Sequence, residues 1–200
     1  MTIKAIETEY NGYRFRSRLE ARWAVFFDAA GIKYEYEPEG FEIEFDDSRI
    51  RYLPDFFLPD FGVYCEVKPN DNSLFKDSSK IGYMVDFDGP MGCGLILLGQ
   101  IPHYEYPYFP THDMLYWNKG VSVKRVRFKE RRQGYPTELL DVEEIGCCST
   151  AEIPREASVE PTYYDESQNA DKDAGIEVFS YDKARKARFE YGETPVVSHG

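Results

Sequence analysis

The sequence predicts an α/β sandwich in which a mixed central sheet is flanked by helices. Residues 17–30 have the apolar spacing of an amphipathic helix, and residues 52–68 have the pattern of a β-hairpin. Residues 94–99 are four aliphatic residues between two glycines, which is typical of a central strand covered on both faces. A helix predicted between the hairpin and this strand places helices on both sides of one sheet.

The N-terminal part predicts a strand or hairpin followed by a helix. Asn11-Gly12 is a turn dipeptide within residues 3–16. Ser17 is a typical N-cap, and Gly31 stands where a left-handed residue ends a helix. The predicted buried stripe of this helix consists of Leu19, Trp23, Phe26 and Ala30.

Glu20 lies beside this stripe and has two interpretations. Ser17-x-x-Glu20 fits a capping box, in which the glutamate binds main-chain N–H groups at the helix start. A glutamate at the edge of the core can instead lean over the sheet and join a site there. One side-chain conformation cannot serve both roles.

Residues 33–45 predict a strand, a turn at 38–40 and a second strand, and residues 46–48 turn the chain into the hairpin. A loop of Pro59-Asp60-Phe61-Gly62 pairs Leu58 with Val63 and places Asp55 opposite Glu66.

Side chains alternate along a strand, so Glu66 and Lys68 share one face while Val67 points to the other. Charges are not gathered against an apolar layer unless they are paired or bind an ion, because burial costs several kcal/mol. The hairpin therefore predicts a divalent cation site.

Pro54-Asp55, ten residues, and then Glu66-Val67-Lys68 resemble the signature of the PD-(D/E)xK nuclease superfamily, which has the restriction-endonuclease-like fold. Residues 15–24 and 182–190 also resemble the opening and closing helices of small phage-type members. The resemblance implies that Asp55 and Glu66 hold Mg²⁺, with Mn²⁺ as a substitute, and that Lys68 assists the attacking water. Glu20 would join them, and the carbonyl of Val67 would be a further ligand.

The segments after the hairpin carry cations and aromatic rings. Residues 69–72 break the strand, and Ser73 is the predicted cap of a helix that reaches about Phe87. Residues 101–118 are predicted to be an irregular loop whose rings either pack on the core or stack on unpaired bases. His103 and His112 lack a ligand pattern and are more typical of surface or hydrogen-bonding histidines.

Residues 121–128 predict a strand in the most basic stretch of the chain. Such a stretch either contacts phosphates or is an edge strand protected by charge. The predicted nucleic-acid-binding residues are Arg16, Arg18, Lys76, Lys80, Lys124, Arg125, Arg127, Arg131 and Arg132.

The charge is unevenly distributed. Of the net charge of −12, residues 138–177 contribute −10, so the remainder is nearly neutral. We expect a nuclease core over residues 1–135, an acidic linker or partly disordered insertion over 136–175, and a C-terminal helix over 176–200 that packs on the core.

The composition limits compartment and partners. The sequence has no apolar run of membrane-spanning length, no secretory apolar segment at the start and no disulfide spacing among its cysteines. We therefore expect a cytoplasmic protein without a membrane partner, in the host cytoplasm if a phage encodes it.

The expected partner is nucleic acid, in the first place DNA, and a homodimer stays open. The expected activity is a DNA endonuclease of recombination, repair or DNA processing. The alternatives are a catalytically silent binding module on the same fold and an acidic mimic of DNA.

Overall fold

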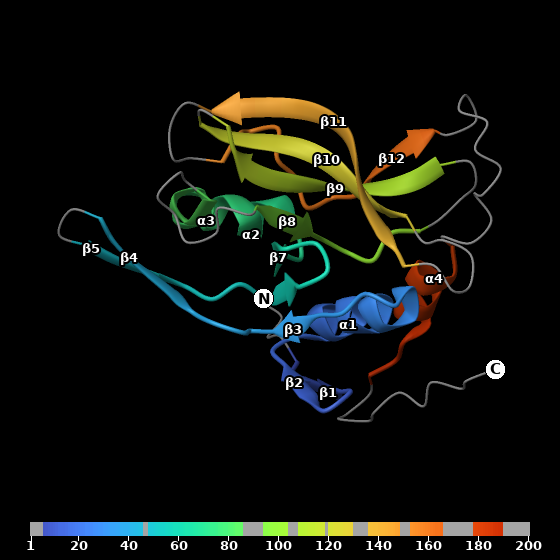
Figure 1. The fold of residues 1–200 in the computed structure, drawn as a ribbon. Coiled ribbons are helices and arrows are strands. Elements are labelled where there is room, and N and C mark those ends of the chain that lie inside the picture. Colours follow the sequence, from blue (N-terminus) through green and yellow to red (C-terminus); the bar gives the residue numbers. More distant parts are fainter. Residues whose placement is uncertain are drawn as a thin grey trace.

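The protein, seen here as a computed structural model, is described over residues 6–45, 48–85, 94–103, 108–118, 120–129, 136–148, 153–165 and 178–189 (Figure 1). Its helices are α1 (Arg18–Ala30), α2 (Asp71–Lys76), α3 (Ser78–Val85) and α4 (Val178–Lys186). Its strands are β1 (Thr8–Tyr10), β2 (Tyr13–Phe15), β3 (Glu35–Tyr36), β4 (Phe41–Phe45), β5 (Ser48–Tyr52), β6 (Phe56–Leu58), β7 (Val63–Val67), β8 (Leu95–Leu98), β9 (Tyr108–Trp117), β10 (Val121–Lys129), β11 (Glu138–Cys148) and β12 (Thr162–Asp165).

The central sheet is mixed, as the sequence predicts. Its order is β11-β10-β9-β8-β7-β6-β3, with β12 paired to β9. Strands β7 and β8 are parallel, whereas β6 with β7 and β8 with β9 are antiparallel. The parallel pair needs a crossover, and α2 and α3 lie in that crossover.

Helices cover the sheet on both faces, which confirms the α/β architecture. Successive residues of the fully buried strand β8 alternate between two apolar clusters. Ile96 and Leu98 pack in the cluster that holds α1 and α4, and Leu95 and Leu97 pack in the cluster that holds α2 and α3. The continuous apolar run was therefore a correct sign of a two-sided strand.

The first helix begins and ends where the sequence predicts. The Ser17 side chain accepts a hydrogen bond from the N–H of Glu20, and Gly31 has a φ of 68°. Trp23 and Phe26 are fully buried, but Leu19 and Ala30 are only half-buried. The predicted stripe was too narrow, because α1 packs against the sheet and also against α4.

The hairpin has the predicted register. Leu58 pairs with Val63, and Phe56 pairs with Cys65. The turn residue Gly62 has a φ of 65°, in the left-handed region that glycine adopts without strain. The N-terminal hairpin β1–β2 also has the predicted turn, with positive φ at Asn11 and Gly12.

Strands β4 and β5 form a separate two-stranded arm that extends from the body (Figure 1). The sequence predicts a strand before and a strand after the turn at residues 38–40, and these correspond to β3 and β4. The two do not pair with each other, because β4 pairs with β5 and β3 pairs with β6. At the base of the arm, Phe41 and Ile50 pack on the cluster beneath α2 and α3, and Tyr52 belongs to that cluster.

Three predictions about the chain after the hairpin are corrected. The predicted helix over 73–87 is two short helices that meet at Asp77, and its cap is Asn70 rather than Ser73. An Asn side chain is a good hydrogen-bond acceptor for the first free N–H groups of a helix, so Asn70 can serve as the cap. Residues 86–93, which include the predicted end at Phe87, lie outside the described part.

The predicted aromatic loop contains the ten-residue strand β9. Pro110 obscured it in the sequence, because a proline cannot donate to a strand ladder. Pro110 here lies opposite Tyr163 of the short strand β12. His112 is buried in β9 and shares a hydrogen bond with Tyr181 of α4, so its expected hydrogen-bonding role is confirmed.

The segment interpreted as an acidic linker contains two strands of the sheet. Residues 138–148 form β11 alongside basic β10, and residues 162–165 form β12. Pairing of opposite charges between neighbouring strands, including Lys124 with Asp141, explains how an acidic sequence joins a sheet. The predicted C-terminal helix is present as α4, which packs on α1.

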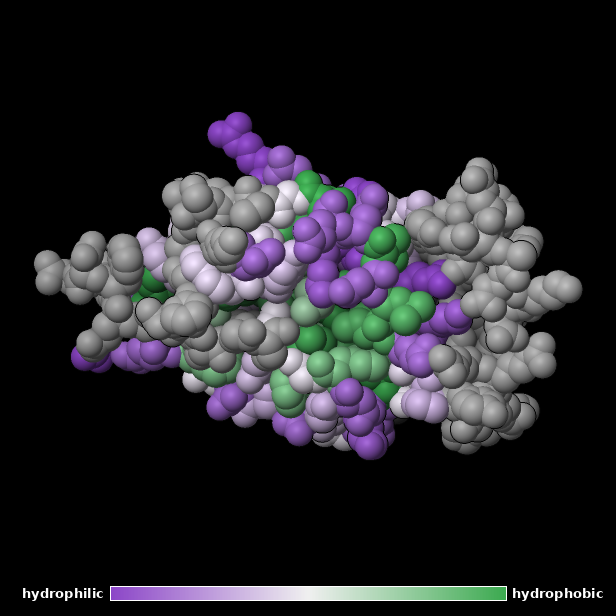
Figure 2. Space-filling model, turned by 45° about the horizontal axis from the view of Figure 1, so that its top comes forward, coloured by the Kyte–Doolittle hydropathy of each residue, from purple (hydrophilic) through white to green (hydrophobic). Residues whose placement is uncertain are grey.

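The surface is not uniformly polar. Figure 2 shows an area of hydrophobic residues bordered by hydrophilic ones, seen when the top of Figure 1 is tilted forward. No helix among the described residues is long and apolar enough to cross a membrane.

Candidate functional site

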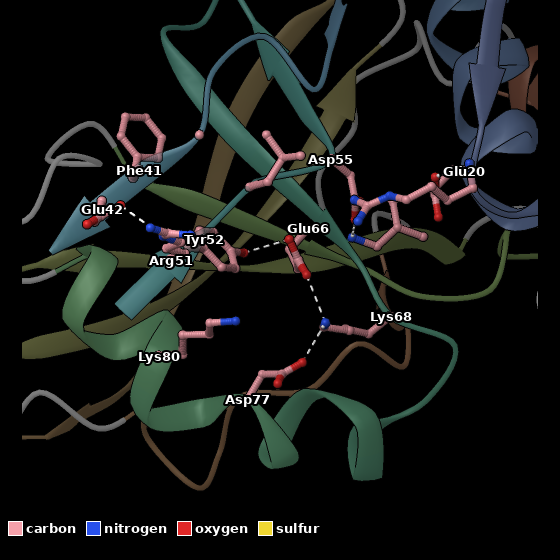
Figure 3. A pocket seen from close by; sticks show the side chains of 14 residues that line it. Glu20, Phe41, Glu42, Arg51, Tyr52, Asp55, Glu66, Lys68, Asp77 and Lys80 are labelled. Carbon is pink, nitrogen blue, oxygen red and sulfur yellow. Dashed lines mark hydrogen bonds and ion pairs between the residues drawn. The ribbon is translucent and has the colours of Figure 1, made fainter. Parts of the chain in front are cut away.

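A cavity of about 780 Å³ lies between the base of the arm, the hairpin β6–β7 and helix α3 (Figure 3). The hairpin contributes its charged residues, the arm contributes one wall and α3 contributes the other. The lining residues are Arg16, Glu20, Gly40, Phe41, Glu42, Arg51, Tyr52, Leu53, Asp55, Glu66, Val67, Lys68, Asp77 and Lys80. All four predicted catalytic residues, and Val67, are among them.

Asp55 stands immediately before β6 and is held from two sides. Its main-chain N–H donates to the carbonyl of Cys65, which extends the hairpin ladder beyond Phe56. One carboxylate oxygen accepts from the N–H of Val67 at 2.7 Å, and the other accepts from Arg16 at 2.8 Å. The side chain is only 6% exposed, so the carboxylate lies at the buried end of the cavity.

Glu66 and Lys68 lie on one face of β7, as the alternation predicts. The Lys68 Nζ donates to Glu66 Oε1 at 2.9 Å, and the Tyr52 hydroxyl donates to Glu66 Oε2 at 2.6 Å (Figure 3). Lys68 also donates to Asp77 Oδ2 at 2.9 Å. Lys68 therefore lies between two carboxylates, one from the sheet and one from the junction of α2 and α3.

Burial raises the pKa of both central carboxylates, and neighbouring negative charge adds to the rise for Asp55. Burial raises the pKa of Asp55 well above its ordinary value, and the charges of Glu66 and Glu20 raise that pKa further. Burial also raises the pKa of Glu66, although Lys68 and the Tyr52 hydroxyl oppose the rise. The charges converge closely enough to interact strongly, and a cation between them would relieve this repulsion.

Lys68 remains charged in this setting. Burial alone would lower the pKa of Lys68, but Glu66 and the hydrogen bond to Asp77 outweigh it and raise the pKa above its ordinary value. The hydrogen bond from Lys68 in turn lowers the pKa of Asp77. The cavity thus contains a fixed ammonium beside the two buried carboxylates.

Glu20 lines the cavity, but its carboxylate takes part in the cap of α1. It accepts from the Ser17 hydroxyl at 2.7 Å, from the N–H of Arg16 at 3.0 Å and from the Tyr36 hydroxyl at 2.7 Å. Of the two roles that the sequence left open, this conformation has the capping one. The hydrogen bond to Arg16 involves the residue before the N-cap, so the arrangement is a shifted capping box.

Arg16 links the cap to the hairpin. Its guanidinium binds Asp55 and forms an ion pair with Glu37. Arg16 and Arg18 were both predicted to bind nucleic acid. Of the two, Arg16 lines the cavity and Arg18 does not.

The predicted phosphate-binding cations are divided by the structure. Lys80 lines the cavity, and Lys76, on the other side of the break at Asp77, does not. In β10, Lys124 pairs with Asp141, and Arg125 pairs with Glu143 and Asp113. Arg127 is buried, and Arg131 and Arg132 lie outside the described residues.

Tyr52, Asp77 and Arg51 are site residues that the sequence did not single out. Tyr52 is the first residue of the predicted hairpin stretch and resembles an ordinary aromatic strand residue, while Asp77 and Arg51 lie in charged surroundings. A weak signal existed for Asp77, since it is the acidic residue nearest to Lys76 and Lys80 in a predicted helix. Only the fold brings these three beside Glu66 and Lys68.

The oxygen donors at the hairpin are sparse. Within the part of the chain that the structure describes, no group of three or more His, Cys, Asp or Glu side chains is arranged to hold a metal ion. Two buried carboxylates with raised pKa values, in a cavity that Val67 also lines, still fit Mg²⁺, which is usually bound by one or two carboxylates and keeps several waters.

Comparison with protein-family models, with curated proteins and with solved structures gave no match to this chain.

Proposed function

We propose that this protein is a metal-dependent nuclease of the PD-(D/E)xK type with a restriction-endonuclease-like fold, a DNA endonuclease of phage type that acts in recombination, repair or DNA processing. The observation that supports the proposal is the meeting of Asp55, Glu66 and Lys68 in one cavity at the end of the β6–β7 hairpin. These are the residues on which the sequence resemblance rests. A mixed sheet with helices on both faces is compatible with the proposed fold.

Asp55 and Glu66 would hold Mg²⁺ or Mn²⁺, and the carbonyl of Val67 would be a further ligand. When bound, such an ion acidifies a coordinated water and offsets the charge that develops on the phosphate. The hydrogen bond from Val67 fixes the orientation of Asp55, and the hydrogen bond from Tyr52 fixes that of Glu66. Both carboxylates are therefore positioned before any ion arrives.

Lys68 would stabilise the oxyanion or orient the attacking water. It is a permanent donor at the cavity wall, because Glu66 and Asp77 keep its pKa raised. Arg16 forms an ion pair with Asp55, and its side chain is 55% exposed, so its guanidinium can turn to a phosphate oxygen. Glu20 contributes chiefly by holding the start of α1 and the main chain of Arg16.

The acidic mimic of DNA is the weaker alternative. A mimic must present its carboxylates to a foreign protein, but Asp141 and Glu143 face cations of the adjacent strand of the same sheet. The acidic strand β11 thus neutralises part of the basic strand β10.

The test is a cleavage panel of linear, circular, single-stranded and branched DNA and of RNA, with Mg²⁺, Mn²⁺ and EDTA. We expect metal-dependent cleavage that Asp55→Asn and Glu66→Gln each reduce by about 10²-fold or more, the scale typical of losing a main electrostatic group of an active site. Glu138→Gln, a change on β11 outside the cavity, is the matched control. Cleavage by Asp55→Asn at the wild-type rate refutes the proposal, and binding without cleavage on every substrate indicates the silent module.

A further inference from the structure

Two of the cations that line the cavity come from neighbouring elements that pack against each other. Arg51 belongs to strand β5 at the base of the arm, and Lys80 belongs to α3. Figure 3 shows Lys80 extending from its helix into the open centre of the cavity, with Arg51 and Glu42 on the arm. Glu66 and Lys68 line the same cavity.

The surroundings of Lys80 favour the binding of an anion by its ammonium group. It is half-buried, and among the described residues no carboxylate lies within ion-pair distance of its Nζ. Asp77, which is three residues earlier, is instead taken by Lys68 at 2.9 Å. A half-buried ammonium is favourable only if an opposite charge or water compensates for its lost hydration.

Arg51 is held in place but keeps donors available. Glu42, directly opposite in the arm, accepts from the Nε of Arg51 at 2.9 Å. A guanidinium has five N–H donors, and this pair uses the one on Nε. Glu42 therefore orients the guanidinium, and within the described residues its terminal nitrogens have no such partner.

We propose that Arg51 and Lys80 form a phosphate clamp that binds the backbone of a nucleic-acid strand next to the phosphodiester that is cut. This inference rests on the proposed nuclease function. It moves the contact surface from basic strand β10, where Lys124 and Arg125 are paired with β11, to the two walls of the cavity. Guanidinium and ammonium groups are the usual partners of phosphate oxygens.

The apolar lining supports a strand rather than a small phosphorylated molecule. Phe41 and Leu53 line the same cavity as the two cations, and Leu53 is among the exposed large hydrophobic residues. Apolar surface beside phosphate-binding cations matches a chain of bases linked by phosphates. The clamp and the metal site together would bind successive parts of one strand.

The chain supplies a matched control for each cation. Lys76 has the same charge as Lys80 on the neighbouring helix, and Arg49 has the same charge as Arg51 on the same strand, but neither lines the cavity. The variants are Arg51→Gln, Lys80→Gln, Arg49→Gln and Lys76→Gln. Thermal unfolding of each variant establishes that it is folded.

Affinity for single-stranded and duplex DNA is measured against salt in Ca²⁺, and KM and kcat for cleavage are measured in Mg²⁺. We expect Arg51→Gln and Lys80→Gln each to weaken binding about tenfold and to raise KM more than they lower kcat. Each should reduce the salt slope by about 0.7 to 0.9, the loss of one phosphate contact. The two controls should remain within about twofold of wild type.

Two results overturn the clamp while leaving the nuclease function intact. One is cleavage by the wild type with unchanged KM, affinity and salt slope in both cavity variants. The other is an equal loss in the cavity variants and their controls, which would indicate a diffuse electrostatic effect. A wild-type protein that neither binds nor cleaves any substrate overturns both proposals.

Discussion

Asp55 has a structural role as well as its proposed catalytic one. Its carboxylate accepts the main-chain N–H of Val67, at the point where the β6–β7 ladder ends. The same contact orients the carboxylate toward the cavity. A hydrogen bond from a main-chain N–H favours the ionised form, but burial and the neighbouring Glu66 outweigh it, so the pKa of Asp55 is raised.

Glu20 provides the first test at the residue scale. Glu20→Gln removes a carboxylate that accepts three hydrogen bonds at the start of α1, so we expect a loss of about 1–2 kcal/mol in the free energy of unfolding. Because this conformation uses Glu20 for capping, metal-dependent cleavage should remain within several-fold of wild type. Urea unfolding and cleavage rate are the two measurements. A large loss of cleavage with unchanged stability would show that Glu20 belongs to the metal site instead.

Asp113 provides a pH test away from the proposed site. Burial raises its pKa from 3.8 to about 6, although the N–H of Ser158 and the charge of Arg125 oppose the rise. The folded state therefore binds a proton that the unfolded chain has released, and the stability from this group is lost as pH rises from about 4 to about 6. We expect Asp113→Asn to be the more stable protein at pH 7, by roughly 2–3 kcal/mol at most.

The measurement is the free energy of unfolding of both proteins from pH 4 to pH 7. The difference between them isolates Asp113, because Asp55 and Glu66, with raised pKa values, titrate in both proteins. A difference that does not change with pH contradicts the assignment.

At the scale of elements, residues 153–160 hold the second core against the sheet. Ile153, Ala157 and Val159 are buried in the cluster beneath α2 and α3. Asp71, in the first turn of α2, accepts from the N–H of Val159 and the hydroxyl of Ser158. The sequence predicts that this segment is part of a linker. In the structure it contacts both α2 and the end of β8.

Gly99 marks how closely this segment approaches β8. A Cβ at residue 99 would lie 2.0 Å from the carbonyl oxygen of Val159, so we expect Gly99→Ala to cost about 1–3 kcal/mol and to loosen residues 153–160. Gly40→Ala is the control, since its Cβ would meet only ordinary contacts at 3.8 Å or more. Urea unfolding and hydrogen exchange at the Val159 amide provide the measurements. Wild-type protection of that amide in Gly99→Ala would refute the close packing.

At the scale of the whole molecule, acidic and basic side chains lie next to one another. Acidic β11 lies beside basic β10, and the cavity combines five acidic side chains with four basic ones. A divalent ion would change that balance to net positive, which favours a polyanion. Metal binding and nucleic-acid binding are therefore expected to support each other.

Mg²⁺ should stabilise the whole fold through the same two carboxylates. A ligand that binds only the folded state raises the free energy of unfolding, by about 2.7 kcal/mol at one hundred times its dissociation constant. We expect Mg²⁺ or Mn²⁺ to raise the unfolding temperature of the wild type, and EDTA to reverse the rise. Asp55→Asn should be more stable than the wild type without metal, because it removes one of two repelling buried charges, and it should gain nothing from metal. An equal rise in both proteins would place the ion elsewhere.

The sequence by itself determined the elements whose signals are local. Ser17 and Gly31 bound α1 through the chemistry of helix ends, and Pro59 to Gly62 fix the hairpin register that brings Asp55 toward Glu66. The continuous apolar run of β8 identified a strand covered on both faces. In each case the physical cause lies within a few residues of the chain.

The tertiary structure decided which distant residues meet. Tyr52, Asp77 and Arg51 reach the cavity only because β5, the junction of α2 and α3, and β7 come together in space, which no local pattern encodes. The same holds for β9, whose proline obscured the strand pattern, and for β11, whose acidic residues become favourable only beside the cations of β10. Local chemistry sets the shape of an element, whereas its partners depend on burial and charge across the whole fold.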